Sequence, residues 1–157
     1  MEELLIEGWR RHLDETNVEL LPGVRDLLER LSRMDNVRLG LLTGNVEAGA
    51  RLKLAPHDLN RYFPHGSFGS DAIDRNQLPP IALERATAHE GYPFTFGQTL
   101  IIGDSHRDIA CARAWGISAL AVATGVLSLD TLLGHAPDAA CDTLLESDFI
   151  FEFIEQT

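Results

Sequence analysis

Short apolar runs alternate with amphipathic segments along most of this 157-residue chain. Apolar runs predict buried strands at about 37–42, 99–102 and 117–123, and a weaker one at 139–142. Apolar positions at helical spacing predict helices at about 2–14, 23–33, 45–54, 80–90, 106–115 and 148–155. Strands that alternate with helices of this length favour parallel pairing with right-handed crossovers. The predicted fold class is therefore α/β, with helices layered on a parallel sheet.

The segment 59–80 interrupts this alternation. It contains Gly66, Gly69 and the pair Pro79-Pro80, residues that break regular structure. We expect a loop here, with one short strand near Ser67-Phe68.

Composition limits the environment and the partners. Thirteen basic and 24 acidic residues give a net charge of −11, and Lys53 is the single lysine. Such an acidic chain is a poor partner for a nucleic-acid backbone or an anionic membrane. The two cysteines, Cys111 and Cys141, form no C-x-x-C pair, which favours reduced thiols over a disulfide. No apolar run approaches the roughly 18 residues of a membrane helix. We expect a cytoplasmic protein with neither nucleic-acid nor membrane partners.

The first predicted strand ends in Thr43-Gly44-Asn45, directly before a helix. In an open parallel sheet, ligands bind beyond the carboxyl ends of the strands. A hydroxyl, a glycine that allows close approach of backbone, and the free N–H groups of a helix start together favour an anion. Alternatively, Thr43 or Asn45 simply caps the helix.

The second predicted strand runs into Gly103-Asp104-Ser105-His106-Arg107-Asp108. The spacing brings the carboxylates of Asp104 and Asp108 to one side of a strand-to-helix turn. Two such carboxylates repel each other unless a cation or proton lies between them, and oxygen ligands suit Mg²⁺. Alternatively, Asp104 caps the helix and Asp108 is a solvated acid in its first turn.

Together the two strand ends resemble the haloacid dehalogenase superfamily, and within it the phosphoglycolate-phosphatase-like hydrolases. The segments Leu21-Pro22-Gly23-Val24 and 121–125 are also similar, so the resemblance spans about 18–155. It implies a Rossmann-like three-layer parallel sheet, Thr43 at the transferring phosphoryl group, and Mg²⁺ held by Asp104 and Asp108. It also implies two parts: residues 1–17 as the last helix of a cap domain, and 18–157 as a truncated core domain.

Two features depart from the family. The family forms an aspartyl-phosphate on a D-x-D segment after its first strand, and this sequence contains no D-x-D. The family's lysine before the long helix is also missing from the stretch 74–80. Arg75 is its best substitute because a guanidinium binds phosphate bidentately, while Arg61 and Arg107 are rival sources of positive charge.

The leading hypothesis is Mg²⁺-assisted hydrolysis of a small phosphorylated substrate without the usual nucleophile. Thr43, Gly44, Asn45 and Arg75 would then bind phosphate. Asp104, Asp108 and His106 would be catalytic, with His106 moving a proton or Asp104 itself acting as nucleophile. The competing hypothesis is a non-catalytic scaffold that dimerises or binds phosphate, or the carboxyl-terminal fragment of a longer phosphatase.

The missing first strand also has a structural consequence. The resemblance places it between the strands at 37–42 and 99–102, where its loss leaves unpaired N–H and C=O groups. Either these two strands pair with each other or a second chain fills the gap. We expect a homodimer, with the helix at 2–14 in its contact.

Overall fold

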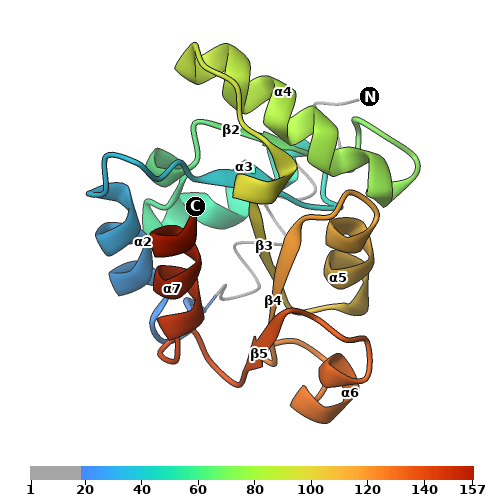
Figure 1. The fold of residues 1–157 in the computed structure, drawn as a ribbon. Coiled ribbons are helices and arrows are strands. Elements are labelled where there is room, and N and C mark those ends of the chain that lie inside the picture. Colours follow the sequence, from blue (N-terminus) through green and yellow to red (C-terminus); the bar gives the residue numbers. More distant parts are fainter. Residues whose placement is uncertain (1–18) are drawn as a thin grey trace.

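The computed structural model describes residues 19–157, and these form an α/β fold in which every strand pairing is parallel. One sheet has the order β3 (Leu100–Gly103), β4 (Ser118–Val122), β5 (Ala139–Cys141). A second sheet pairs β1 (Gly40–Leu42) with β2 (His65–Ser67) (Figure 1). The predicted fold class is confirmed.

Helices connect the strands. They are α2 (Val24–Ser32), α3 (Glu47–Leu54), α4 (Leu78–Glu90), α5 (His106–Arg113), α6 (Leu129–Leu133) and α7 (Asp148–Gln156). All but α6 were predicted, with ends that differ by no more than two residues. The helix expected at 2–14 and the division at residue 17 lie outside the described residues. No described helix is long and apolar enough to span a membrane.

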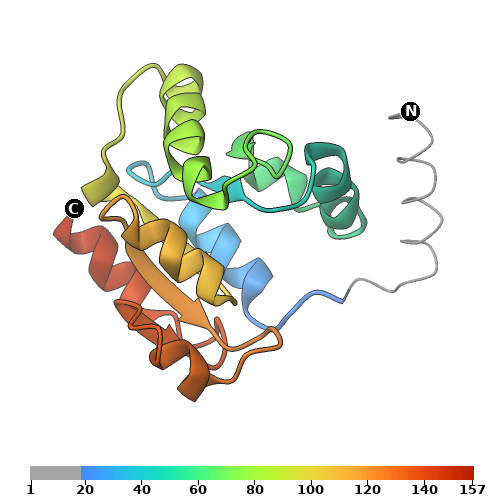
Figure 2. The same ribbon diagram turned by 90° about the vertical axis from the view of Figure 1, so that its right-hand side faces the viewer.

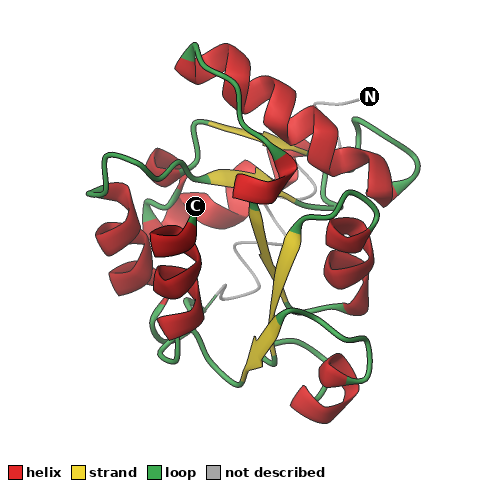
Figure 3. Ribbon diagram, viewed as in Figure 1, coloured by secondary structure: helices red, strands yellow, loops and turns green. Residues whose placement is uncertain are grey.

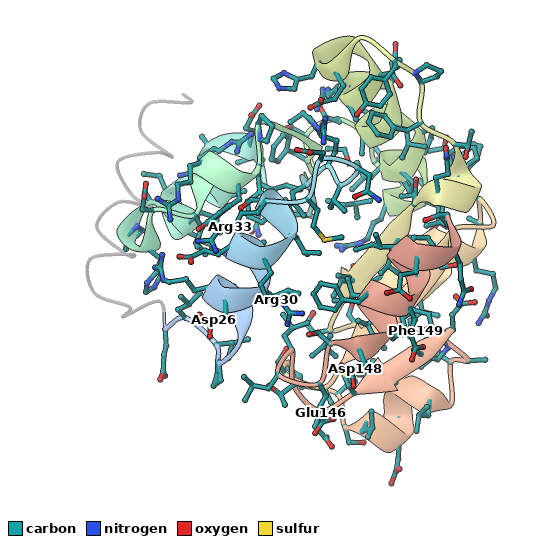
Figure 4. The ribbon with its side chains drawn as sticks, turned by 60° about the vertical axis from the view of Figure 1, so that its left-hand side comes forward. Asp26, Arg30, Arg33, Glu146, Asp148 and Phe149 are labelled. Carbon is teal, nitrogen blue, oxygen red and sulfur yellow. The ribbon has the colours of Figure 1, made fainter. Side chains whose placement is uncertain are left out.

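Helices cover both faces of the three-stranded sheet, because successive side chains of a strand point to opposite faces. Leu120 and Val122 of β4 pack in one apolar cluster with α2 and α7. Ala119 and Ala121, which alternate with them along the strand, pack against α5, and Ala121 also contacts α6. Figures 1 and 2 show the resulting three layers. On the first face, α2, which carries Arg30, lies beside α7 (Figure 4). The Arg30 guanidinium is 4.1 Å from the centre of the Phe151 ring of α7.

The parallel sheet is divided rather than continuous. Within the described residues β1 pairs with β2 alone and β3 with β4 alone, so the strands at 37–42 and 99–102 do not pair with each other. The strands of the two sheets also run in different directions (Figure 3). Ile102, in the middle of β3, is 39% exposed, although strands of a parallel sheet are normally buried on both faces. Of the two arrangements expected for a missing central strand, direct pairing is thus excluded.

Helix α4 packs on the two-stranded sheet, and buried apolar side chains and the hydrogen bonds of one arginine hold it there. Leu78 of α4 and Phe68, just after β2, are almost completely buried. Arg85 of α4 donates hydrogen bonds to the Gly66 carbonyl (2.8 Å) and to both carboxylate oxygens of Asp71 (2.6 and 2.8 Å). The segment that leads into α4 is therefore held close to the carboxyl end of β1.

Candidate functional site

A polar cavity of about 490 Å³ lies where the carboxyl ends of β1 and β3 meet. Its lining comes from the two strand ends and from one residue before α4: Leu42, Thr43, Gly44, Asn45, Arg75, Ile102, Gly103, Asp104, Ser105, Arg107 and Asp108. Six of the seven predicted site residues are brought together here. The seventh, His106, is not in the lining, and its ring stacks on His135 with centroids 5.3 Å apart.

The Thr43 hydroxyl is fixed in a way that leaves its proton available. Its oxygen accepts hydrogen bonds from the backbone N–H and from the side-chain Nδ2 of Asn45, both at 3.1 Å. Because both bonds use lone pairs of the oxygen, the hydroxyl hydrogen is free to be donated to a ligand. Helix α3 has Val46 as its N-cap, with no side-chain capping bond. The alternative in which Thr43 or Asn45 caps that helix is therefore not observed.

Lys53 also reaches this loop, which the sequence analysis missed. Its Nζ donates to the Asn45 Oδ1 at 3.2 Å, so the ammonium orients the same amide that contacts Thr43. A signal for this contact exists in the spacing. Lys53 follows Asn45 by eight residues, about two helical turns, and helical side chains lean toward the amino end of their helix.

Asp108 is buried and fully engaged. Its Oδ2 accepts from the Ser105 backbone N–H (3.1 Å) and hydroxyl (2.7 Å), which forms a capping box at the start of α5. Its Oδ1 accepts from the Nη2 of Arg75 at 2.5 Å. A Cβ on Gly103 would overlap the Asp108 carboxylate, so only glycine fits at the end of β3. The solvated-acid alternative for Asp108 is therefore not observed.

Asp104 contrasts with Asp108 although both belong to one motif. It is exposed, and no other described residue bonds to its carboxylate within hydrogen-bond or ion-pair distance. The backbone of Gly125 passes beside it, and a Cβ at that position would overlap the Asp104 carboxylate. The described residues contain no cluster of three or more His, Cys, Asp or Glu side chains that could hold a metal ion. They still fit Mg²⁺, which is commonly held by one or two carboxylates and completed by water and phosphate oxygens.

Arg75 joins the two halves of the cavity. It lies in the 3₁₀ turn η3 (Arg75–Gln77), directly before α4. Its Nη2 bonds to Asp108, and its Nη1 lies beside Gly44, 3.1 Å from where a Cβ would stand. Its Nε is buried without a hydrogen-bond partner. Of the rival arginines, Arg107 lines the cavity, whereas Arg61 bonds to Tyr62 and Asp58 elsewhere.

The fold and the cavity define the class of protein: a parallel α/β protein with a polar cavity at the carboxyl ends of its strands. A family model described as HAD-hydrolase-like matches residues 78–147. Phosphoglycolate phosphatase from Synechococcus elongatus is 29% identical over 80% of this chain and 56% of its own length. The Pseudomonas syringae pv. tomato phosphoglycolate phosphatase is 32% identical over 66% of this chain and 37% of its own. In sequence, the chain is thus similar to haloacid dehalogenase-like hydrolases and, among them, to phosphoglycolate phosphatases, which agrees with the predicted family.

Solved structures agree on the fold. A haloacid dehalogenase-like hydrolase from Streptococcus pneumoniae superposes with a TM-score of 0.70 and 26% identity, covering 85% of this chain and 60% of that one. The HAD-hydrolase YfnB from Bacillus subtilis, bound to magnesium, has a TM-score of 0.70 and 22% identity, covering 96% and 62%. The chain spans about half or less of the two curated relatives and about three fifths of these structures.

Proposed function

We propose that this chain hydrolyses phosphate esters of small molecules with the help of Mg²⁺ and without the family's aspartate nucleophile. The observation that carries the proposal is the single cavity that collects the Thr43 hydroxyl, the Arg75 guanidinium and the unpaired Asp104 carboxylate. The phosphatases among its relatives support the reaction class.

The phosphate group would bind between the two strand ends. Thr43 has a hydroxyl proton to donate, and Arg75 keeps its Nη1 donors after its Nη2 is committed to Asp108. Arg107 adds a second guanidinium to the lining. Charge-assisted hydrogen bonds from arginine to phosphate are about twice as strong as neutral ones, so the arginines would contribute most of the affinity.

Asp104 would hold the metal, because its carboxylate is exposed to the cavity and is not paired with a cation. Asp108 already bonds to Arg75 and Ser105, so its main role would be to orient that arginine, and one lone pair of its Oδ1 would be left for the metal. A bound Mg²⁺ would polarise a phosphate oxygen and offset the negative charge that gathers during transfer. The YfnB structure bound to magnesium supports the choice of this metal.

Hydrolysis also needs a group that attacks the phosphate and a group that carries a proton. A catalytic His106 would have to turn away from His135 to reach the cavity. Asp104 can act either as the metal ligand or as the nucleophile, and its replacement by asparagine removes both functions. Asparagine keeps the shape of the side chain, so the substitution tests its charge.

The experiment measures release of inorganic phosphate from phosphoglycolate and from p-nitrophenyl phosphate by the purified chain, with Mg²⁺ or with chelator. We expect Mg²⁺-dependent hydrolysis that falls about 100-fold or more in Asp104→Asn, as for loss of a principal electrostatic group. Asp130→Asn, an exposed acid in the first turn of α6, is the matched control and should keep full activity. Activity that survives Asp104→Asn, or that ignores the chelator, would remove this site from the reaction.

A non-catalytic scaffold is the second candidate, and the divided sheet favours it. The β1 and β3 edges that face away from β2 and β4 carry unpaired backbone groups, which a second chain could pair with to give a homodimer. Phosphate binding without hydrolysis of either ester would support this candidate.

A cytoplasmic location remains part of the proposal, supported by two buried, free cysteines.

A further inference from the structure

Arg75 reaches the cavity from a short turn, so something outside that turn must hold it in place. A 3₁₀ turn of three residues has little stability of its own, and an arginine side chain loses conformational entropy when it is fixed. Within the turn, only the Asp74 side chain helps, by accepting from the Asn76 N–H at 2.9 Å.

Helix α5 and the residues just after it supply the missing support. The indole Nε1 of Trp115 donates to the Asn76 carbonyl at 2.6 Å. The thiol of Cys111 donates to the carbonyl of Arg75 itself at 3.4 Å. Each side chain is thus bonded to the backbone of the turn, not to the guanidinium.

Both donors are themselves well fixed. Cys111 is completely buried, and burial raises the pKa of its thiol to about 11, so it remains a protonated donor. The Trp115 ring packs against Phe96 with centroids 5.2 Å apart, and both belong to the apolar cluster under β3 and β4. The turn is therefore anchored to the core and not to a mobile surface.

Asp108 lies on the same side of α5 as Cys111, because it precedes Cys111 by three residues, and Trp115 follows two residues after the helix ends. Asp108 bonds to the Arg75 guanidinium, whereas Cys111 and Trp115 bond to the backbone of its turn. The cation and its carboxylate partner are consequently held by one rigid unit.

We propose that Cys111 and Trp115 are positioning residues that fix the η3 turn, and through it the Arg75 guanidinium, at the cavity. The effect on phosphate rests on the proposed function, whereas the effect on Arg75 does not. Without these two bonds the turn can shift, and Arg75 must then be ordered at the moment a phosphate binds, which weakens binding.

The test uses variants that remove one donor and little else. Trp115→Phe keeps an aromatic ring beside Phe96 but has no N–H. Cys111→Ala removes the thiol donor, and Cys111→Ser restores a donor of similar size. Tyr92→Phe, at a half-exposed site in the loop after α4, is the control for general loss of a polar aromatic group. Backbone amide spectra show whether each variant is folded.

Two readouts are compared in the full chain. The first is hydrogen exchange of the Arg75 Nε–H by ¹H–¹⁵N NMR, with the signal assigned by its loss in Arg75→Lys. Because this Nε is buried, its exchange should be slow in the wild type and at least tenfold faster in Trp115→Phe and Cys111→Ala. The second is the Kd of inorganic phosphate by calorimetry, which should rise about five- to tenfold in the same variants. Cys111→Ser and Tyr92→Phe should resemble the wild type in both.

The outcomes separate the two proposals. Unchanged Nε–H exchange in folded Trp115→Phe and Cys111→Ala would overturn the positioning role, whether or not phosphate binds. Faster exchange in a chain whose wild type binds no phosphate would support the positioning role and overturn the proposed phosphate site. If Trp115→Phe does not fold, the comparison of Cys111→Ala with Cys111→Ser decides.

Discussion

Asp104 and Asp108 have opposite surroundings, although the sequence motif predicts the same metal-binding role for both. Asp104 is exposed and unpaired, whereas Asp108 is 7% exposed and accepts three hydrogen bonds. An exposed, unpaired carboxylate is available to a ligand. A buried, paired one mainly holds its partners. The two residues should therefore respond differently to the same substitution.

We expect Asp108→Asn to lower the free energy of unfolding by about 2–3 kcal/mol, because the Arg75 guanidinium then lacks its counter-charge. Asp104→Asn should change it by less than about 0.5 kcal/mol, as is usual for surface positions. Urea denaturation of both variants beside the wild type measures the difference. Equal losses of stability in the two variants would contradict the distinction.

His65 predicts a pH dependence of stability. Both of its ring nitrogens are buried without a hydrogen-bond partner, and its ring lies 5.5 Å from that of His89. Burial, with a smaller effect from His89, lowers the pKa of His65 below 6.5. Below pH 6.5 the unfolded chain therefore binds a proton that the folded chain resists. His65 therefore leaves the free energy of unfolding unchanged above pH 6.5 and lowers it as the pH falls from 6.5 toward the folded-state pKa.

The expected result is a Tm that decreases from pH 7.5 to 5.5 more in the wild type than in His65→Gln, which cannot take up the proton. Thermal denaturation followed by circular dichroism at both pH values measures the two decreases. His135→Gln, at an exposed position far along the chain from His65, serves as the matched control. The same decrease in His65→Gln as in the wild type would assign the effect to other groups.

The site residues that the sequence predicted follow from one rule, that ligands bind at the carboxyl ends of parallel strands. Thr43 and Asp104 stand directly after β1 and β3, so the rule places them together before any coordinates are known. Lys53 and Trp115 escaped the sequence analysis, because their contacts depend on how helices pack. Hydrogen bonds between distant segments leave no periodic pattern in a sequence.

Among the elements, prediction succeeded where burial is strongest. The strands β3 and β4 are apolar runs with nearby glycines, and both were predicted to within a residue or two. Helix α6 has only five residues, fewer than two helical turns, so its apolar spacing gives little signal. The strand predicted from residue 37 begins only at Gly40, and Val37 and Leu39 instead pack against the α2–α7 cluster. The apolar character of Val37 and Leu39 thus reflects their packing in this cluster and not membership of a strand.

The attachment of α4 to β2 depends on Arg85. Its bonds to both oxygens of Asp71 lower the pKa of that carboxyl below 3.8. In Arg85→Gln the Asp71 titration, followed by NMR, should move upward toward 3.8. Since Arg85 is partly exposed, the loss of stability at neutral pH should be only about 1 kcal/mol. An unmoved Asp71 midpoint would show that the pair does not form in solution.

At the scale of the whole molecule, α2 connects the two sheets. Its Leu27 and Leu31 pack in the cluster under β4 and β5, whereas Leu28 packs with Leu59 and Tyr62 in a second cluster beyond α3. Among the described residues no strand pairing joins the sheets, so apolar packing takes over that role. The sequence pointed to a missing central strand but could not show that the sheets would remain apart, because that outcome depends on tertiary packing.

The divided sheet leads to the last prediction, which concerns association. The unpaired edge of β3 exposes Ile102, and exposed strand edges tend to pair with other chains. Sedimentation velocity from about 1 to 100 μM should show a dimer that forms with increasing concentration, as expected of a weak, small interface. Ile102→Lys places a charge at this edge and should shift the chain toward monomer, whereas Leu133→Lys, at a half-exposed site in α6, should not. A monomer at every concentration, or equal effects of the two lysines, would mean that this edge does not carry association.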